Sequence, residues 1–473
     1  MAIGFTQKYK IINPKKRMAT RLIDFCLSPW FTIARGLGYQ HGIRNKPIDL
    51  KSLKKILIIR TAYIGDVIMT LPMLQPLKRA CPQAEITMLV PTGAAPLLEN
   101  HPYVDKVIPY NAFWFYKQRR QSSPLEEYVN DLGLDSLDTV QLVLELEEQF
   151  GKESRNLDSR EIKKYIDKRV QEISDGREKL ESFKLYYPGK ADYKNVIQHI
   201  QSEKYDLVID ARGDIRDIYF LVYRSHAKYR VSYGFGGGSY FLTHVVPYTE
   251  LIHKVDAHLD LLRYLGIQVL QEDQKLEIFL TDEEKRKAKE KLRELGIQDS
   301  DTVIGIHPGG RKPLKSWQPE KYAQLADKIS SNSKTKILVT GTEDEKPIID
   351  QMVKNMTQNP MVLAGKTNIR ELAAIISQCA MFITNDSAPM HISAAVGTPS
   401  LAIFGPSKSI ETSPYGKGHQ IVENDYPCRW TCDEDKCYHI EYHGCIKSIE
   451  VEQVLQTALE LINTDIEAKK VRT

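Results

Sequence analysis

The amino-acid sequence predicts an α/β protein with two doubly wound parallel sheets, and three observations support this. Short apolar strands alternate with helical segments in a series that starts at residue 54 and resumes at 193, and again in a series that starts at residue 302. The chain of 473 residues is too long for one ordinary core. Its 42% apolar and 27% charged residues are typical of a soluble globular protein.

The first series opens with a buried strand. Lys54–Arg60 is a short β-branched run without alternation, as in a parallel sheet. We expect Thr61–Gly65 to form a turn and Asp66 to open a helix. Further strands are predicted at 84–90, 106–110 and 205–210, and helices at 94–99 and 193–202.

The second series opens with the predicted strand Thr302–Pro308. Between the two series, Thr281–Leu295 is a highly charged helix, expected near the interdomain connection. Two open α/β sheets with facing strand ends leave a cleft, where such folds bind ligands. The other strands are predicted at 335–340, 361–363, 381–384 and 400–404, and the helices at 319–330, 345–355 and 369–379.

These patterns divide the chain into two α/β domains with additions. The expected parts are a basic, aromatic N-terminal extension (1–50), an N-terminal Rossmann-like domain (51–117 and 188–281), a helical insert within it (118–187), a connecting helix (282–300), a C-terminal Rossmann-like domain (301–460) and a tail (461–473).

The extension mixes basic with aromatic and apolar side chains over residues 10–36. Such a segment suits contact with an anionic membrane face, and a helix packed on the main body is the alternative. We expect no membrane-spanning helix and no cleaved signal peptide. The net charge of +4 argues against a bulk nucleic-acid role.

The segment Met381–Pro399 predicts an anion site at a helix start. A short strand breaks at Asn385-Asp386, and the small residues Ser387 and Ala388 let backbone N–H groups approach an anion closely. Asp386 can cap the helix or accept from a ribose or sugar hydroxyl. This is the local chemistry of a nucleotide diphosphate site, and an ordinary capped strand-to-helix turn is the alternative.

Seven cysteines are present, and four of them cluster near the C-terminus. Zinc knuckles usually carry tighter pairs, so reduced structural thiols or disulfides are the leading interpretation and metal binding the alternative. The scattered cysteines Cys26, Cys81 and Cys379 are expected to be packed thiols. The clustered ones are Cys428, Cys432, Cys437 and Cys445.

Four segments in order resemble the family 9 glycosyltransferases, the ADP-heptose:lipopolysaccharide heptosyltransferases. They are Arg60-Thr-Ala-Tyr-Ile-Gly-Asp-Val-Ile-Met-Thr-Leu-Pro, His307-Pro-Gly-Gly-Arg with Lys315-Ser-Trp, Thr340-Gly-Thr-Glu-Asp-Glu and Asn385-Asp-Ser-Ala-Pro-Met-His. The resemblance covers roughly residues 54–117 and 188–455. It implies the GT-B fold, with the acceptor on the N-terminal domain and a nucleotide sugar on the C-terminal one.

The resemblance implies that Asp66 is the catalytic base, with Arg60 and Gly65 on the acceptor side. A carboxylate that opens a helix at a strand's end can take the acceptor hydroxyl proton, although simple N-capping is the alternative. Lys315 would neutralise the leaving diphosphate as a metal does elsewhere. On its own, a loop lysine such as this one would mean little.

The remaining positions would hold the nucleotide sugar. Glu345 would accept from ribose hydroxyls or merely cap its own helix, and His391 would bond phosphate or pack in the core. Arg311 stands where several heptosyltransferases have hydroxyl residues and would substitute electrostatically. The other implied contacts are Gly309 and Gly310, which let the backbone come close, and Asp386, Ser387 and Ala388, which would hold the diphosphate end.

The insert has a resemblance of its own. Leu125–Phe150 holds eight carboxylates and no Lys or Arg, and Tyr128–Gly151 looks like the centre of an acyl carrier protein. That resemblance maps the 4′-phosphopantetheine attachment site onto Ser136, at a helix start where a phosphodiester is favoured. A helical insert that kept the sequence and lost the carrier function is the competing interpretation, because no amphipathic first helix precedes it.

We therefore expect an inverting, metal-independent glycosyltransferase that moves a sugar, with heptose the leading choice, from an ADP-sugar to a lipid-linked or lipopolysaccharide-type acceptor. No cofactor is expected for transfer, and the enzyme should be cytoplasmic with peripheral contact on the inner face of the bacterial cytoplasmic membrane. A carrier or scaffold protein modified at Ser136 is the alternative. A nucleotide-sugar 2-epimerase of similar fold is a third interpretation without support from the Ile-Gly-Asp segment.

Overall fold

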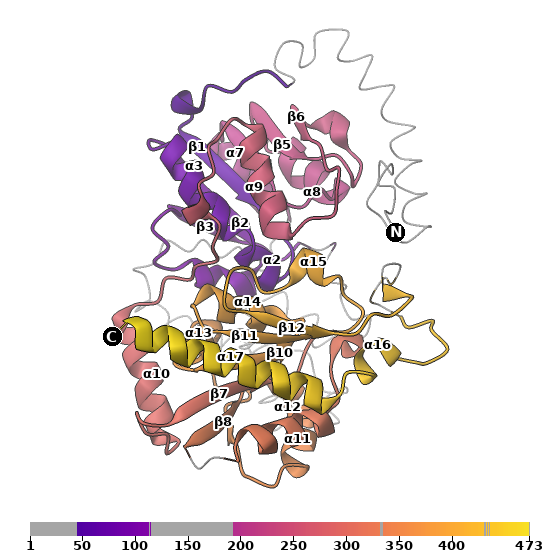
Figure 1. The fold of residues 1–473 in the computed structure, drawn as a ribbon. Coiled ribbons are helices and arrows are strands. Elements are labelled where there is room, and N and C mark those ends of the chain that lie inside the picture. The colour runs from indigo at the N-terminus through magenta and orange to yellow at the C-terminus, as the bar shows by residue number, and fades with distance from the viewer. Residues whose placement is uncertain are drawn as a thin grey trace, which may run out of the picture.

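The computed structural model describes residues 45–112, 114, 193–331, 334–429, 432, 434 and 436–472. Within them the chain forms two lobes, each built on a six-stranded sheet (Figure 1). Every pairing in both sheets is parallel. The predicted α/β class with two doubly wound domains is therefore confirmed.

The N-terminal lobe carries a sheet of order β3-β2-β1-β4-β5-β6. The strand order reverses between β1 and β4, which is where ligands bind in open α/β sheets. The strands are β1 (Lys55–Ile59), β2 (Glu85–Val90), β3 (Lys106–Pro109), β4 (Leu207–Asp210), β5 (Tyr229–Tyr233) and β6 (His244–Val246). The helices are α2 (Ile64–Ile68), α3 (Leu74–Ala80), α7 (Tyr193–Glu203), α8 (Ile215–Asp217) and α9 (Lys254–Tyr264).

The C-terminal lobe repeats this order as β12-β11-β10-β7-β8-β9, with the reversal between β7 and β10. Its strands are β7 (Thr302–His307), β8 (Thr335–Val339), β9 (Met361–Val362), β10 (Met381–Asn385), β11 (Ser400–Phe404) and β12 (Gln420–Glu423). Its helices are α10 (Asp282–Glu294), α11 (Pro319–Ile329), α12 (Lys346–Lys354), α13 (Ile369–Ile376), α14 (Ala388–Ala395), α15 (Ser409–Thr412), α16 (Gly444–Lys447) and α17 (Val451–Arg472).

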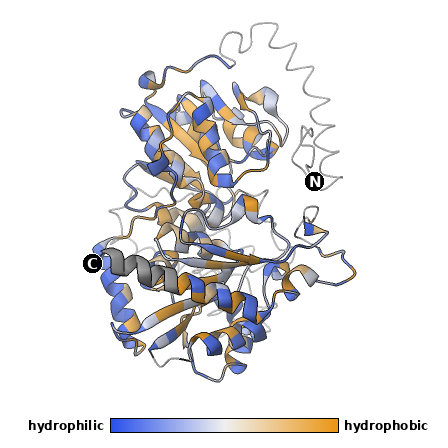
Figure 2. Cartoon of the chain, in the orientation of Figure 1, coloured by the Kyte–Doolittle hydropathy of each residue, from blue (hydrophilic) through white to orange (hydrophobic). Residues whose placement is uncertain are grey.

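The core of each lobe lies between its sheet and the covering helices. Figure 2 shows hydrophobic strands in both sheets and hydrophilic outer faces on helices such as α10. The central strands β1 and β10 are buried on both faces, which explains their continuous apolar sequence. Burial of this apolar surface is the main driving force for forming each lobe.

The structure departs from the predicted elements in several places. Helix α2 begins at Ile64, two residues before the predicted start at Asp66. The segment predicted as a helix at 94–99 is a 3₁₀ helix over Thr92–Leu98, because Pro96 inside it cannot donate an α-helical hydrogen bond. Helix α17 runs across the predicted boundary at residue 460. The short strands β5, β6 and β12 were not predicted.

Most of the predicted extension and all of the predicted insert (118–187), including Ser136, lie outside the described residues. In the part of the chain that is described, no helix combines the length and the apolar character needed to span a bilayer.

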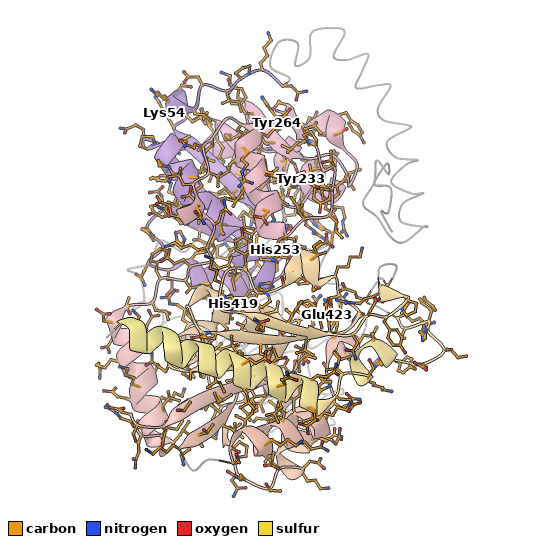
Figure 3. All side chains as sticks on the ribbon, viewed as in Figure 1. Lys54, Tyr233, His253, Tyr264, His419 and Glu423 are labelled. Atoms are coloured by element: carbon orange, nitrogen blue, oxygen red, sulfur yellow. The ribbon has the colours of Figure 1, made fainter. Side chains whose placement is uncertain are left out.

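The two lobes touch through loops and helix ends. Helix α2 packs against α14, and the backbone N–H of Ile278 donates to the Ala395 carbonyl at 3.0 Å. His253, at the start of α9, contacts the Ser413 carbonyl through Nε2 at 2.9 Å; Figure 3 shows His253 at this junction. The loops that follow β1 and β10 therefore face each other.

Candidate active site

Asp66 lies in the first turn of α2, directly after β1. Its Oδ1 atom is 2.7 Å from Arg60 Nη2 and 3.2 Å from Lys254 Nζ. Tyr63 occupies the N-cap position of α2, so the alternative role of Asp66 as a simple N-cap is wrong. Among the described residues both cations contact Oδ1, which leaves Oδ2 of this buried carboxylate to meet a substrate group.

The charges around Asp66 keep it ionised. Burial by itself would raise its pKa, but Arg60, Lys254 and Arg212 outweigh burial and hold the pKa well below its usual value. Arg60 is fixed in turn by donating from Nη1 to the Ala211 carbonyl at 2.7 Å, at the end of β4. The switch point of the first sheet thus presents an anionic oxygen flanked by cations.

In the C-terminal lobe, Asn385 at the end of β10 ties three loops together. Its Oδ1 accepts from the Trp317 N–H at 3.0 Å and from the Tyr322 hydroxyl at 2.9 Å. Its Nδ2 donates to the carbonyls of Pro308 at 2.8 Å and Gly309 at 3.1 Å. This side chain is buried and fully used, so its role is to position the loops that carry the predicted ligand contacts.

Lys315 and Asp386 form an ion pair at the second switch point, with Nζ 2.7 Å from Oδ2. Lys315 Nζ is also 2.7 Å from Glu434 Oε2. Burial opposes the charge of Lys315, but Asp386 and Glu434 outweigh it and raise the pKa of the lysine. For Asp386, burial is likewise outweighed, chiefly by Lys315, and its pKa is lowered. The lysine is therefore held as a cation beside the start of α14.

Glu345 packs against the loop after β7. Its Oε2 accepts from the Thr342 N–H at 2.7 Å, so it does take part in capping, and it lies 3.4 Å from His307 Nε2. Burial would raise the pKa of Glu345, but His307 and the Thr342 N–H overcome it and lower the pKa to about 2. A Cβ on Gly309 would lie 2.4 Å from Glu345 Oε1, so only glycine fits beside this carboxylate.

The start of α14 meets the N-terminal lobe at His391. Ser387 is the N-cap residue without a side-chain capping bond, and its Oγ is 3.1 Å from Thr384 Oγ1. A Cβ on Gly65 would lie 2.5 Å from Cδ2 of His391. Burial lowers the pKa of His391 to about 4, against the opposing effects of Asp386 and Asp66. Carboxylates from both lobes therefore act on the charge of this buried imidazole.

Arg311 forms a second contact between the lobes. Its guanidinium carbon lies 3.5 Å from the centre of the Tyr63 ring, a cation–π geometry. Tyr63 directly precedes α2, so Arg311 of the β7 loop reaches the loop that carries Asp66. Gly310 has more room than Gly309, since an added Cβ would come no closer than 3.7 Å to Ser316 Oγ.

The site brings together the predicted residues and adds others that sequence reasoning missed. Lys254 and Glu434 belong to no quoted motif, and Asn385 was quoted without a role. Lys254 is separated from Asp66 by 188 positions, so no local pattern could signal the pair. Asn385 had a detectable signal, because a buried amide at a strand's end needs several hydrogen-bond partners.

Of the clustered cysteines, Cys445 is buried, and Cys428, Cys432 and Cys437 are half-buried. The described residues contain no group of three or more His, Cys, Asp or Glu side chains placed to hold a metal ion. Cys81 and Cys379 are buried, as predicted for packed thiols. Cys26 lies outside the described residues.

Comparison with known sequences gives one family. The family model of glycosyltransferase family 9 (heptosyltransferase) matches residues 194–440, more than half of the chain. Lipopolysaccharide heptosyltransferase 3 of Escherichia coli K12 is 24% identical over 414 residues, covering 85% of this chain and 96% of that protein. Lipooligosaccharide heptosyltransferase 2 of Campylobacter jejuni is 31% identical over 170 residues, covering 35% of this chain and 53% of that protein.

Solved structures show the same fold. A family 9 glycosyl transferase from Veillonella parvula aligns with a TM-score of 0.62 at 21% identity, covering 88% of this chain and 99% of that chain. The ADP-heptose LPS heptosyltransferase II of E. coli aligns with a TM-score of 0.57 at 18% identity, covering 87% and 99%. The structure of E. coli WaaC with ADP aligns with a TM-score of 0.56 at 17% identity, covering 86% of this chain and 99% of that chain. The expected GT-B arrangement of two Rossmann-like domains is thereby confirmed.

Proposed function

Because this chain belongs to glycosyltransferase family 9, we propose that it transfers heptose from ADP-heptose to a lipopolysaccharide-type acceptor, with inversion at the anomeric carbon and without a metal ion. The names of its relatives support heptose and a lipopolysaccharide acceptor. The E. coli WaaC structure with ADP supports an adenine nucleotide. One observation carries the proposal: α2, which carries Asp66, packs against α14, and the Lys315–Asp386 pair lies at the start of α14.

On the acceptor side, Oδ2 of Asp66 accepts the hydroxyl proton as the acceptor oxygen bonds to the anomeric carbon. Arg60 and Lys254 lower the basicity of Asp66, so the proton moves late, once the attacking oxygen has become acidic. The same cations suit an acceptor that carries phosphate or carboxylate groups. A single displacement of this kind inverts the configuration.

On the donor side, the bond between the anomeric carbon and the diphosphate oxygen breaks and leaves ADP with added negative charge. Lys315 and the N–H groups at the start of α14, near Ser387 and Ala388, stabilise that charge. Glu345 accepts from the ribose hydroxyls, and Arg311 adds positive charge at the loop after β7. We place the enzyme on the inner face of the cytoplasmic membrane, because its proposed acceptor is a lipid.

Donor identity is tested by thermal unfolding with ADP-, UDP- and GDP-sugars. A ligand that binds only the folded chain raises the midpoint by mass action, so ADP-heptose should give the largest shift. Transfer of labelled heptose to a heptose-deficient lipopolysaccharide acceptor then tests the reaction. Stabilisation by a UDP-sugar alone, or an epimerised free nucleotide sugar as product, would contradict the proposal.

The role of Asp66 is tested by Asp66→Asn. Loss of the base should lower kcat about a hundred- to ten-thousandfold while ADP affinity stays within about threefold, because Asp66 lies across from the nucleotide. The matched control is Asp260→Asn, which removes a surface carboxylate paired with Arg263 at 2.6 Å. Retained transfer, or loss of ADP binding together with transfer, would assign Asp66 a structural role.

A further inference from the structure

Glu434 forms an ion pair with the ammonium group of Lys315, the group that binds the diphosphate in the proposed reaction. Its Oε2 atom lies 2.7 Å from Lys315 Nζ and 3.6 Å from Lys312 Nζ. The Lys315 side chain is 18% exposed and that of Glu434 26% exposed, so solvent screens this ion pair only in part. The contact is therefore a specific feature of the site.

With Glu434 in place, Lys315 is already shared by two carboxylates. Asp386 and Glu434 both lie 2.7 Å from Nζ, and Lys312, 3.6 Å from Glu434, offsets only part of their negative charge. A diphosphate that approaches this lysine meets like charge at short range, and such repulsion is costly where water is partly excluded. One of the two carboxylates has to move before a diphosphate oxygen can take its place.

The backbone shows which carboxylate moves. Asp386 stands in the two-residue connection between the buried strand β10 and α14, and its position is fixed by both elements. Glu434 belongs to no helix or strand. It adopts φ of +63°, an unfavourable region for a residue with a side chain, and its N–H donates to Cys432 Sγ at 3.4 Å. A strained loop residue changes conformation at lower cost than a core connection.

We propose that Glu434 is a resident counter-ion of Lys315 that the donor's diphosphate must displace. Glu434 thereby weakens nucleotide binding and speeds release of the nucleotide diphosphate product, since the carboxylate returns to Lys315 as the product leaves. This inference rests on the proposed function in one respect, namely that Lys315 binds the diphosphate.

The test is a comparison of wild type, Glu434→Gln and Glu441→Gln as full chains. Glutamine keeps the shape of Glu434 and removes its charge. Glu441 is the matched control, because its carboxylate lies in the same loop and accepts from the Tyr426 hydroxyl instead of a lysine near the site. Calorimetric titrations measure ADP and inorganic pyrophosphate binding, and stopped-flow mixing measures ADP release.

Glu434→Gln should bind ADP and pyrophosphate about tenfold more tightly and release ADP correspondingly more slowly, while Glu441→Gln matches wild type. In a Lys315→Gln background the effect of Glu434→Gln should vanish, since the carboxylate then has no ammonium to compete for. The melting midpoints of all variants confirm that each is folded.

Unchanged or weaker binding in Glu434→Gln would overturn the inference, and weaker binding would make Glu434 a positioning residue for Lys315. The two proposals fail separately. Equal ADP affinity in wild type and Glu434→Gln would contradict the counter-ion role of Glu434 and leave the proposal of an ADP-sugar donor unaffected. Absence of ADP binding in every variant, with tighter pyrophosphate binding in Glu434→Gln, ends the ADP proposal and supports the counter-ion.

Discussion

His391 is one of the residues at which the two lobes pack against each other. Its ring fills the space that a side chain on Gly65 would need. Its Nδ1 atom has no hydrogen-bond partner among the described residues, although the ring is buried. A buried imidazole nitrogen without a partner suits a ligand oxygen, which is the role that the resemblance implies for His391.

The lowered pKa of His391 predicts a dependence of stability on pH. Below pH about 6.5 the unfolded chain binds a proton at this residue, whereas the folded chain does so only near its pKa of about 4. The stability that the neutral His391 contributes is therefore lost as pH falls from about 6.5 towards 4.

His391→Gln should make the loss of unfolding free energy between pH 7 and pH 4.5 less steep, measured by denaturant titration at each pH. The control is His226→Asn, which changes an exposed histidine at φ of +59°, a conformation that asparagine tolerates. Equal steepness in wild type and His391→Gln would show that His391 protonates as readily in the folded chain as in the unfolded one.

At the scale of elements, the short helices α2 and α14 pack against each other where the lobes meet. Gly65 lies in the first turn of α2 and faces His391 of α14. The resemblance implied Gly65 only as part of the acceptor side. The structure adds a packing reason, because a larger residue would push the two helices apart.

Gly65→Ala should destabilise the chain by about 1–3 kcal/mol through overpacking and reduce sugar transfer, measured by denaturant unfolding and by initial rates. Gly93→Ala is the control, since its added Cβ would lie 3.9 Å from Ile64 Cδ1, an ordinary contact. The double variant Gly65→Ala with His391→Ala should recover part of the lost stability. Additive losses in the double variant would place the damage elsewhere.

At the scale of the whole molecule, Arg370 of α13 joins the lobes to the connecting segment. It donates to the carbonyls of Pro96 at 3.0 Å in the N-terminal lobe and Phe279 at 2.9 Å in the connection. It also donates to Glu284 Oε2 of α10 at 2.8 Å, and this hydrogen bond is the largest cause that lowers the pKa of Glu284, to about 2. A cavity of about 440 Å³ lies beside these residues.

Arg370→Gln should lower the free energy of unfolding by about 3–5 kcal/mol, because it strands a partly buried carboxylate and several carbonyls. It should also weaken the contact between the lobes, detected as faster amide hydrogen exchange in residues 97–99 and 279–284. Arg286→Gln is the control, because this exposed arginine pairs with the surface carboxylates of Glu283 and Glu290 and its loss should change stability by less than about 1 kcal/mol. Similar losses in both variants would contradict a special role for Arg370.

Much of the fold was predictable because its signals are local. The apolar runs of β1, β7 and β10, and the turn-and-helix segments at Asp66 and Asp386, follow from spacing within a few residues. The short edge strands β6 and β12 could not be predicted, because a strand of three or four residues carries too weak a hydrophobic pattern. The predicted site residues outside the insert are all described, but their distances and partners required the structure.

What the sequence determined by itself was the alternation of strands and helices and the residue types at the strand ends, because backbone propensity and burial act between near neighbours. Only the tertiary structure decided that Lys254 and Arg60 share one oxygen of Asp66, and that Glu434 holds Lys315. Those choices depend on which strands adjoin and how the lobes meet. Charges from distant parts of the chain interact through space, so the folded topology sets which of them pair.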